Sequence, residues 1–389
     1  MSRDFDAAVI GLGGIGSAAA YWLARSLGDR VVGFEQFELG HHHGASQDHS
    51  RIIRLSYHRP DYVRLARRAY ATWAEVEAES GATIVTRTGG LDLFPPGAAI
   101  PEIDYTTSMS AERVAFDRLG AAEVMTHWPQ WRLDEGTVGL FQADAGIADP
   151  NIGNAAHQRL AVAHGADLRD RSPVARLTDT REGIRIELRD GRTVVAGKVV
   201  IAADAWTNEL LAWFDLRLPL TITQEQVTYV GVADPAVFAP ERFPVWIWMD
   251  DPSFYGFPTY GEAGPKAAQD VGGPEVTPAT RSWEPDPAAQ RRLETFLERH
   301  LPGMVAPPIR TKTCLYTLTP DRDFVVDAVP GHPDVLVLLG AAHGFKFASV
   351  LGRIAAEWWW MARRPPHRSS RHSGSIASAC APAVLAARS

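Results

Sequence analysis

Residues 11–16 form the motif that most constrains how this chain can fold. They have the spacing G-x-G-x-x-G, as Gly11-Leu12-Gly13-Gly14-Ile15-Gly16. An apolar run precedes them at residues 7–10, and a helical pattern of apolar residues follows at residues 15–23. A second strand-like run then ends at Glu35. In a β-α-β unit, such glycines allow a tight turn, close approach to a pyrophosphate, and packing of helix on strand. The motif therefore predicts a dinucleotide-binding fold.

The cofactor contacts follow from the same unit. A helix N-terminus offers free N–H groups and the positive end of its dipole to phosphates. Gly11, Gly13, Gly14, Ile15 and Gly16 are therefore candidate cofactor-binding residues. Glu35, nineteen residues after the last glycine, can accept hydrogen bonds from a ribose. The motif does not separate FAD from NAD, and a plain glycine turn in an α/β protein is the alternative.

Length and charge limit the class of protein. A chain of 389 residues suggests two domains. The net charge of −7 gives no footprint for nucleic acid and no polybasic patch for a membrane. No apolar run is long enough to span a bilayer, and the chain enters its first strand without room for a signal peptide. We therefore expect a cytoplasmic protein without a nucleic-acid or membrane partner.

Few residues suggest metal or thiol chemistry. Two cysteines, Cys314 and Cys380, make neither a disulfide framework nor a metal cluster. Three consecutive histidines at residues 41–43 cannot all point at one ion. We expect a solvated loop there and no metal site.

Lysine and arginine positions are more informative. Arginine is abundant, whereas lysine occurs only at positions 198, 266, 312 and 346. Because lysine can lose its proton and arginine cannot readily do so, each lysine is a candidate for a functional role. Arg51 and Arg54 are three residues apart, which would place both on one face of a helical turn. The alternative is two unrelated surface arginines.

The strand patterns indicate a discontinuous nucleotide-binding domain. Buried-type strands recur at residues 198–203 and 335–340, and a glycine turn and a helix follow the second of them. Residues 101–135 look helical and loop-like, and the section after residue 219 is rich in β-branched and aromatic residues. We predict an α/β class, α+β overall, with a Rossmann-like domain and a second, mainly antiparallel-sheet substrate domain. The expected ranges are 1–86, 143–218 and 313–363 for the first domain, 87–142 and 219–312 for the second, and 364–389 for a loosely structured tail.

Seven short segments, in the same order along residues 5–362, point to one family. They are residues 11–16 with Glu35, Ser50-Arg51-Ile52-Ile53-Arg54, Thr86-Arg87-Thr88-Gly89, Ala203-Asp204-Ala205-Trp206, Tyr255-Gly256-Phe257-Pro258, Cys314-Leu315-Tyr316-Thr317 and His343-Gly344-Phe345-Lys346-Phe347. Together they resemble the monomeric sarcosine oxidase family of flavoprotein amine oxidases, which includes N-methyltryptophan oxidase and pipecolate oxidase. The joint occurrence is more specific than any one segment.

The resemblance implies FAD held covalently by Cys314, in a Cys-x-Tyr motif. Without the resemblance, such a cysteine would be read as a buried small hydrophobic residue. Lys266 matches the lysine near flavin N5 that activates O2. The alternative is an exposed lysine in a loop at residues 264–266. Tyr255 and Tyr316 match tyrosines of the substrate cavity.

The resemblance also assigns the charged groups. Arg54 and Lys346 match the pair that binds the substrate carboxylate. Arg51 matches an arginine nearer the flavin ring, where positive charge favours the anionic reduced flavin. The remaining implied cofactor contacts are Ser46, Gly344, Phe345 and Lys346.

Three positions depart from the sarcosine oxidase pattern. Asp270 stands in place of a histidine, Gln47-Asp48 in place of a histidine-glycine pair, and Asp204 in place of a glycine. Asp270 either contacts the substrate or holds Lys266 or an arginine. Since Phe254, Tyr255 and Tyr316 leave room for a bulkier ligand, we expect a larger or cyclic secondary amino acid to be a better substrate than sarcosine.

The expected activity is that of an FAD-dependent oxidase of secondary amino acids. The amine C–N bond becomes an imine, which water hydrolyses, and O2 becomes H2O2. The expected partners are the small-molecule substrate and O2, and the expected state is a monomer. The alternatives are an FAD-dependent amine or imino-acid dehydrogenase with another acceptor, an NAD(P)-linked dehydrogenase, and a non-catalytic flavin-binding homologue.

Overall fold

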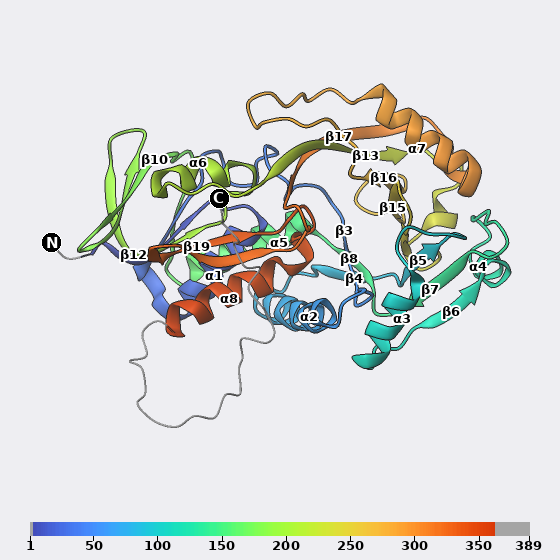
Figure 1. Cartoon of the computed structure of the whole chain (residues 1–389), viewed down its shortest axis with the longest axis horizontal. Coiled ribbons are helices and arrows are strands. Elements are labelled where there is room, and N and C mark those ends of the chain that lie inside the picture. Colours follow the sequence, from blue (N-terminus) through green and yellow to red (C-terminus); the bar gives the residue numbers. More distant parts are fainter. Residues whose placement is uncertain (1–2, 362–389) are drawn as a thin grey trace, which may run out of the picture.

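The structure of the protein is a computed structural model that describes residues 3–361. Two eight-stranded sheets and one three-stranded sheet form its framework. Figure 1 shows the first sheet at the end of the molecule that carries the N-terminus and the second sheet at the opposite end. The predicted tail at residues 364–389 lies outside the described residues.

The first sheet contains the predicted nucleotide-binding unit. Its parallel strands are adjacent in the order β19 (His332–Leu339), β12 (Thr193–Ile201), β1 (Phe5–Ile10), β2 (Val31–Phe34) and β9 (Asp167–Arg169). The hairpin of β10 (Val174–Thr180) and β11 (Gly183–Leu188) extends it antiparallel from β12, and β18 (Val325–Val329) pairs with β19. All four residues of β2 are buried, as in a parallel strand covered on both faces.

Helices bury one face of this sheet. The helix α1 (Gly14–Leu27) connects β1 to β2 and packs against α5 (Pro150–Ala163) and α8 (Ala348–Met361). The helices α1 and α8 approach closely, because a Cβ at Gly352 of α8 would lie 2.5 Å from the carbonyl carbon of Ala18 in α1. Asp149 caps α5 by accepting a hydrogen bond from the Ile152 amide. The helix α2 (Pro60–Ser80) packs on α8 and α5, and α6 (Thr207–Leu211) lies near the hairpin (Figure 1).

The second sheet is mainly antiparallel, as predicted. Its strand order is β17 (Pro308–Leu318), β13 (Thr221–Val230), β16 (Lys266–Asp270), β15 (Ser253–Phe257), β14 (Val245–Trp248), β5 (Gly90–Phe94), β7 (Val138–Gln142) and β6 (Asp117–Gly120). Within the described chain, β14 and β5 are its one parallel pair. The helix α7 (Pro287–His300) covers one face, where Phe296 stacks on Phe254 with ring centroids 4.2 Å apart. Phe254 therefore belongs to the core and does not shape the substrate space.

The third sheet lies between the other two (Figure 1). It consists of β3 (Arg51–Ile53), β8 (Gly146–Ala148) and β4 (Val85–Arg87). The helices α3 (Glu102–Ala111) and α4 (Ala121–His127) flank the far edge of the second sheet. The short helices are η1 (Gly28–Arg30), η2 (Asp204–Trp206), η3 (Ala212–Phe214), η4 (Pro235–Phe238), η5 (Pro302–Met304) and η6 (Phe345–Phe347). No helix of residues 3–361 has the length and apolar character to cross a bilayer.

The α/β class with a Rossmann-like part is confirmed, but two local predictions are wrong. Residues 51–53 form a strand, so Arg51 and Arg54 do not share a helical face. The section at residues 101–135 contains the strand β6. Pairing between distant strands decides both features, and a local sequence pattern does not reveal such pairing. The strand β17 pairs with β13, so the second sheet continues to residue 318.

Candidate active site

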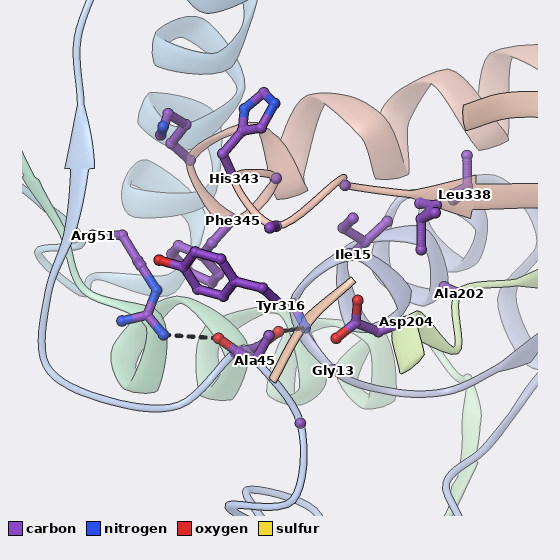
Figure 2. Close-up of a pocket in the computed structure, with 18 of the residues that line it drawn as sticks. Gly13, Ile15, Ala45, Arg51, Ala202, Asp204, Tyr316, Leu338, His343 and Phe345 are labelled. Carbon is purple, nitrogen blue, oxygen red and sulfur yellow. Dashed lines mark hydrogen bonds between the residues drawn. The ribbon is translucent and has the colours of Figure 1, made fainter. Parts of the chain in front are cut away.

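One cavity of about 1020 Å³ joins the glycine motif to the second sheet. Its lining includes residues 11–15 of the motif, Glu35, Ser46, Arg51, Arg54, Tyr255, Asp270, Tyr316, Gly344, Phe345 and Lys346. Figure 2 shows Arg51 and Tyr316 on one side of it, and Gly13, Ile15 and Asp204 on the other. Since small-ligand pockets typically measure about 300–1,000 Å³, this volume suits an extended cofactor together with a small substrate.

The glycines of the motif meet different structural requirements. Gly11 has φ +87°, and a Cβ at Gly16 would lie 1.8 Å from the Gly11 carbonyl oxygen. Both are therefore required by the turn and the helix packing. A Cβ at Gly13, in contrast, would meet no atom of the described chain closer than 3.4 Å. Since Gly13 lines the cavity, its missing side chain leaves room for a ligand to approach the backbone.

The end of β2 presents a fixed carboxylate. Glu35 is buried, and its Oε2 and Oε1 accept hydrogen bonds from the amides of Leu12 (2.9 Å) and Phe37 (3.1 Å). Burial alone would raise the pKa of Glu35, but hydrogen bonds with His41 and these amides hold it below its usual value. Glu35 is therefore an ionised acceptor, as the ribose contact requires.

The histidine tract contributes to this region in an unexpected way. The His41 side chain is 12% exposed, with its Nε2 3.4 Å from Glu35 Oε1. The expectation of a solvated loop is therefore wrong for His41. Its neighbour His43 stacks on Phe37 at 4.1 Å between ring centroids. No cluster of three metal-ligating side chains occurs among residues 3–361.

Ser46, in the loop after β2, lies beside the first residue of α1. Its Oγ accepts a hydrogen bond from the Gly14 amide (2.9 Å), and its carbonyl accepts one from Asn154 (2.8 Å). Gly344 and Phe345 come from the turn into η6, where a Cβ at Gly344 would lie 2.5 Å from Gly340 Cα. The structure therefore brings these three predicted cofactor residues to the same cavity as the glycine motif.

Alternate residues of β17 share one face, which puts Cys314 on the same face as Tyr316, although Tyr316 lines the cavity and Cys314 does not. Lys312, Cys314 and Tyr316 are each two residues apart on the strand. Tyr316 Oη lies 3.3 Å from Tyr255 Oη on β15. Cys314 therefore faces the same region as both tyrosines. Burial raises the pKa of the Cys314 thiol to about 11, although the nearby Arg51 guanidinium acts in the opposite direction.

Arg51 is held by the backbone around it. Its guanidinium donates to the carbonyls of Ser50 (2.8 Å), Ala45 (2.7 Å) and Gln47 (2.8 Å). The bond to Ala45 is drawn in Figure 2. A cation fixed in this way cannot swing away, so it supplies a constant positive charge at the cavity wall.

Lys266 is buried, so its interpretation as an exposed loop lysine is wrong. It begins β16, and its side chain is 1% exposed. Its Nζ donates to Asp48 Oδ2 (2.9 Å) and to the Ser50 carbonyl (2.9 Å), and it lies 4.1 Å from the centroid of the Phe257 ring. Burial lowers the pKa of Lys266 to about 8, against the attraction of Asp48.

Asp48 is a buried carboxylate beside Lys266 to which the sequence reasoning assigned no role. Its side chain is 4% exposed and accepts from Lys266, from Lys312 (3.0 Å) and from the Tyr229 hydroxyl (2.8 Å). Although burial favours the protonated acid, Lys266, Arg51 and Lys312 hold the pKa of Asp48 far below its usual value. The signal in the sequence was the departure at Gln47-Asp48 from the family pattern.

Arg54 has a carboxylate partner that the sequence did not reveal. Its Nη1 donates to Asp92 Oδ1 (2.6 Å), and Ser56 donates to the other oxygen of this buried aspartate (2.5 Å). Arg54 Nε is buried without a hydrogen-bond partner in the described chain. Leaving a buried donor without a partner destabilises the fold by about 1–3 kcal/mol. A ligand in the cavity that accepts a hydrogen bond from this N–H would remove that cost.

Asp270 has an ion-pair partner in the described chain, whereas Lys346 has none. Lys346 Nζ makes no hydrogen bond or ion pair with any residue of the described ranges, and burial, reinforced by Arg54, lowers its pKa to about 7. Asp270 pairs with Arg322 at 2.9 Å. It lies four residues from Lys266 on the same strand, about 13 Å away at 3.3 Å per residue. Of the roles considered for Asp270, it thus holds an arginine and not Lys266.

Asp204 is a further group at the cavity wall. It has φ +46°, and its buried Oδ2 has no hydrogen-bond partner within residues 3–361. Burial raises its pKa to about 6. The aspartate therefore differs from the expected glycine in charge but keeps the left-handed backbone that favours glycine.

Comparison with known proteins agrees with this geometry. The family model described as FAD dependent oxidoreductase matches residues 6–358. Monomeric sarcosine oxidase of Streptomyces avermitilis is 35% identical over 366 residues, 92% of this chain and 94% of that protein. N-methyl-L-tryptophan oxidase of Salmonella newport is 31% identical over 361 residues, 91% of this chain and 94% of that protein.

A solved structure is similar over nearly the whole chain. It is the open form of NikD, described as an unusual amino acid oxidase essential for nikkomycin biosynthesis. The TM-score is 0.84 and the identity 26%, with 99% of each chain covered. The family suggested by the seven sequence segments is thus confirmed: the chain belongs to the FAD dependent oxidoreductases, among relatives named sarcosine and N-methyltryptophan oxidases.

Proposed function

We propose that this chain is an FAD-dependent oxidase of secondary amino acids that converts the amine to an imine and O2 to H2O2. The observation that carries the proposal is one continuous cavity, which joins the glycine motif to Arg54 and Lys346. Relatives named as oxidases of sarcosine and N-methyltryptophan support the chemical class of the substrate. We also propose a monomeric enzyme, for which the name of the first of these relatives gives support, and a cytoplasmic location.

The residues present fit FAD. The turn at Gly11–Gly14 and the start of α1 would hold the pyrophosphate, and the buried Glu35 would accept from the ribose. Cys314 would form the covalent bond. When bound, FAD supplies the two-electron redox chemistry, and the chain supplies orientation and charge. The first and third sheets would form the FAD-binding domain, and the second sheet the substrate domain, with β17 carrying Cys314 between them.

The substrate would bind by its carboxylate. Lys346 has no carboxylate partner of its own, and Arg54 keeps a free Nε–H although Asp92 balances its charge. Tyr255 and Tyr316 would border the amine end of the ligand. The Asp270–Arg322 pair adds a polar wall, which favours a substrate larger than sarcosine. We assign no side chain as a general base, so the amine would react after losing its proton on binding.

A screen of amines tests this function. We expect secondary amino acids, cyclic or N-methylated, to bleach the flavin without oxygen and to release peroxide in air. Removing the carboxylate from the best substrate should lower kcat/KM about 10- to 100-fold, since a charged hydrogen bond is lost. Equal turnover of amines with and without a carboxylate would refute the proposed substrate site. Bleaching without reoxidation in air would favour the dehydrogenase alternative.

The carboxylate site also predicts a dependence on pH. The pKa of Lys346 is lowered to about 7, so its ammonium is present below that pH and lost above it. We expect kcat/KM for the carboxylate substrate to fall as pH rises through about 7. Lys346→Met should lower kcat/KM and remove this falling limb. Lys346 is a cleaner test than Arg54, because removing Arg54 would leave the buried Asp92 without its partner. The same limb in the methionine variant would contradict the assignment.

A further inference from the structure

A buried cluster of charges surrounds Lys266. Asp48 Oδ2 lies 2.9 Å from Lys266 Nζ and 3.8 Å from Arg51 Nη1, and Asp48 Oδ1 lies 3.0 Å from Lys312 Nζ. Three cations therefore converge on one carboxylate. Tyr229 on β13 adds a hydrogen bond from its hydroxyl to the same carboxylate. The carboxylate has a partner on each of its oxygens and no freedom to turn away.

The backbone at Asp48 is strained. Its φ of +121° lies in a region that L residues rarely adopt and that glycine adopts without penalty. The side chain therefore has to compensate for an unfavourable backbone. Its contacts with Lys266, Arg51 and Lys312 provide that compensation.

Apart from Asp48, none of the groups described here around Lys266 supplies a full negative charge. Arg51 is a like charge, and Lys312 on β17 is another beyond the carboxylate. Phe257 on β15 offers a ring face, Tyr229 on β13 a neutral hydroxyl, and Cys314 on β17 a protonated thiol. Without Asp48, this lysine would lie buried among cations, where the neutral amine is favoured.

We propose that Asp48 is a positioning residue for the reaction with oxygen, because its carboxylate fixes Lys266 beside the Ser50 carbonyl and keeps it an ammonium ion. This inference rests on the proposed oxidase function. In that reaction, O2 gains two electrons and one proton from the anionic reduced flavin and one proton from solvent, leaving as H2O2. A nearby ammonium stabilises the negative charge that develops on oxygen. Asp48 thus acts through Lys266 and need not touch oxygen itself.

The first experiment measures the protonation of Lys266 without any turnover. Because the chain has four lysines, the flavin-loaded protein labelled with 13C at lysine Cε should give four NMR signals. Lys266→Met assigns the relevant signal. The pKa of Lys266 should be near 8 in the parent protein. In Asp48→Asn, it should fall by at least about one pH unit, since the largest attraction is gone.

Two further variants make this result decisive. Glu262→Gln is the matched control, because Glu262 pairs with Arg310 and His49 rather than with Lys266. It should leave the Lys266 titration unchanged. Lys312→Met removes a cation that competes with Lys266 for Asp48, so it should raise the pKa of Lys266. This variant also tests the inference if Asp48→Asn does not fold. An unchanged titration in both Asp48→Asn and Lys312→Met, or in Lys312→Met alone if the first does not fold, would overturn the inference.

The second experiment follows reoxidation of the reduced flavin by O2 across pH. A drop of one unit leaves about one tenth of Lys266 protonated at pH 8, against about one half. Reoxidation of Asp48→Asn should thus be at least about fivefold slower at pH 8 and recover at lower pH. If the parent and Asp48→Asn show the same pH profile of reoxidation while Lys266→Met is slow, the role of Asp48 is overturned and that of Lys266 is not. A parent enzyme that does not react with O2 would overturn the proposed oxidase function, while the NMR titration would still report on the ion pair.

Discussion

Replacing Lys266 with methionine is expected to slow reoxidation of the reduced flavin by O2 about 10²- to 10³-fold, the usual effect of removing one group that stabilises developing negative charge. Methionine keeps the length and apolar bulk of the side chain in a space that is nearly inaccessible to solvent. Asp48 would retain Lys312 and Arg51 as partners, so no buried carboxylate is left unpaired. The change should therefore remove one charge without unfolding the site. Rapid mixing of reduced enzyme with oxygenated buffer measures the rate.

Two comparisons separate this role from a structural one. Anaerobic reduction of the flavin by substrate should change much less than reoxidation, because the proposed carboxylate ligands lie on other elements, Lys346 on η6 and Arg54 directly after β3. Lys198→Met removes a lysine that pairs with Asp334 on the first sheet, and it should leave both half-reactions unchanged. Equal slowing of both half-reactions in Lys266→Met would show that this lysine maintains the fold of the pocket instead.

Replacing Cys314 with serine is expected to abolish covalent attachment of the flavin. In the parent protein, the yellow colour should remain with the chain after acid denaturation, whereas in Cys314→Ser all of it should stay in solution. Serine is nearly isosteric and the thiol is buried and protonated, so the strand β17 should form as before. Turnover should fall strongly, because the flavin would no longer be held in position by the covalent bond to Cys314. Absorbance of the washed precipitate provides the measurement.

The other cysteine supplies the control. Cys380 lies outside the described residues, in the section predicted to be a loosely structured tail. Cys380→Ser should keep all of the flavin on the denatured chain. A flavin-bearing peptide that contains Cys380, or free FAD released from the parent protein, would contradict the assignment to Cys314.

The part of the site built by local sequence was the easiest to predict. The turn at Gly11, the helix that begins at Gly14 and the strand that ends before Glu35 all lie within one short stretch. Each follows from a backbone rule: a positive φ, a close helix–strand contact, and an exposed helix N-terminus. The parallel strands near residues 200 and 335 were also identifiable, because burial on both faces makes them continuously apolar.

Partners from distant segments could not be predicted in the same way. Lys266 and Asp48 are 218 residues apart, and Arg54 and Asp92 are 38 apart, yet both pairs are in direct contact. The resemblance to a family identified Lys266 and Arg54 but not the carboxylates that balance them. Asp48 in particular stands at a position where the family pattern has glycine, so no motif of the family predicts its role.

The sequence by itself determined the dinucleotide-binding unit, the family, and many of the residues that line the cavity, because those features depend on motifs and spacing along the chain. Only the tertiary structure decided which charges meet. The register of β13, β16 and β17 places Tyr229, Lys266 and Lys312 around Asp48, and the opposite end of β16 carries Asp270 to Arg322. A buried charge changes its pKa and its chemistry with every neighbour within a few ångströms, and those neighbours are chosen by sheet pairing between segments far apart in the chain.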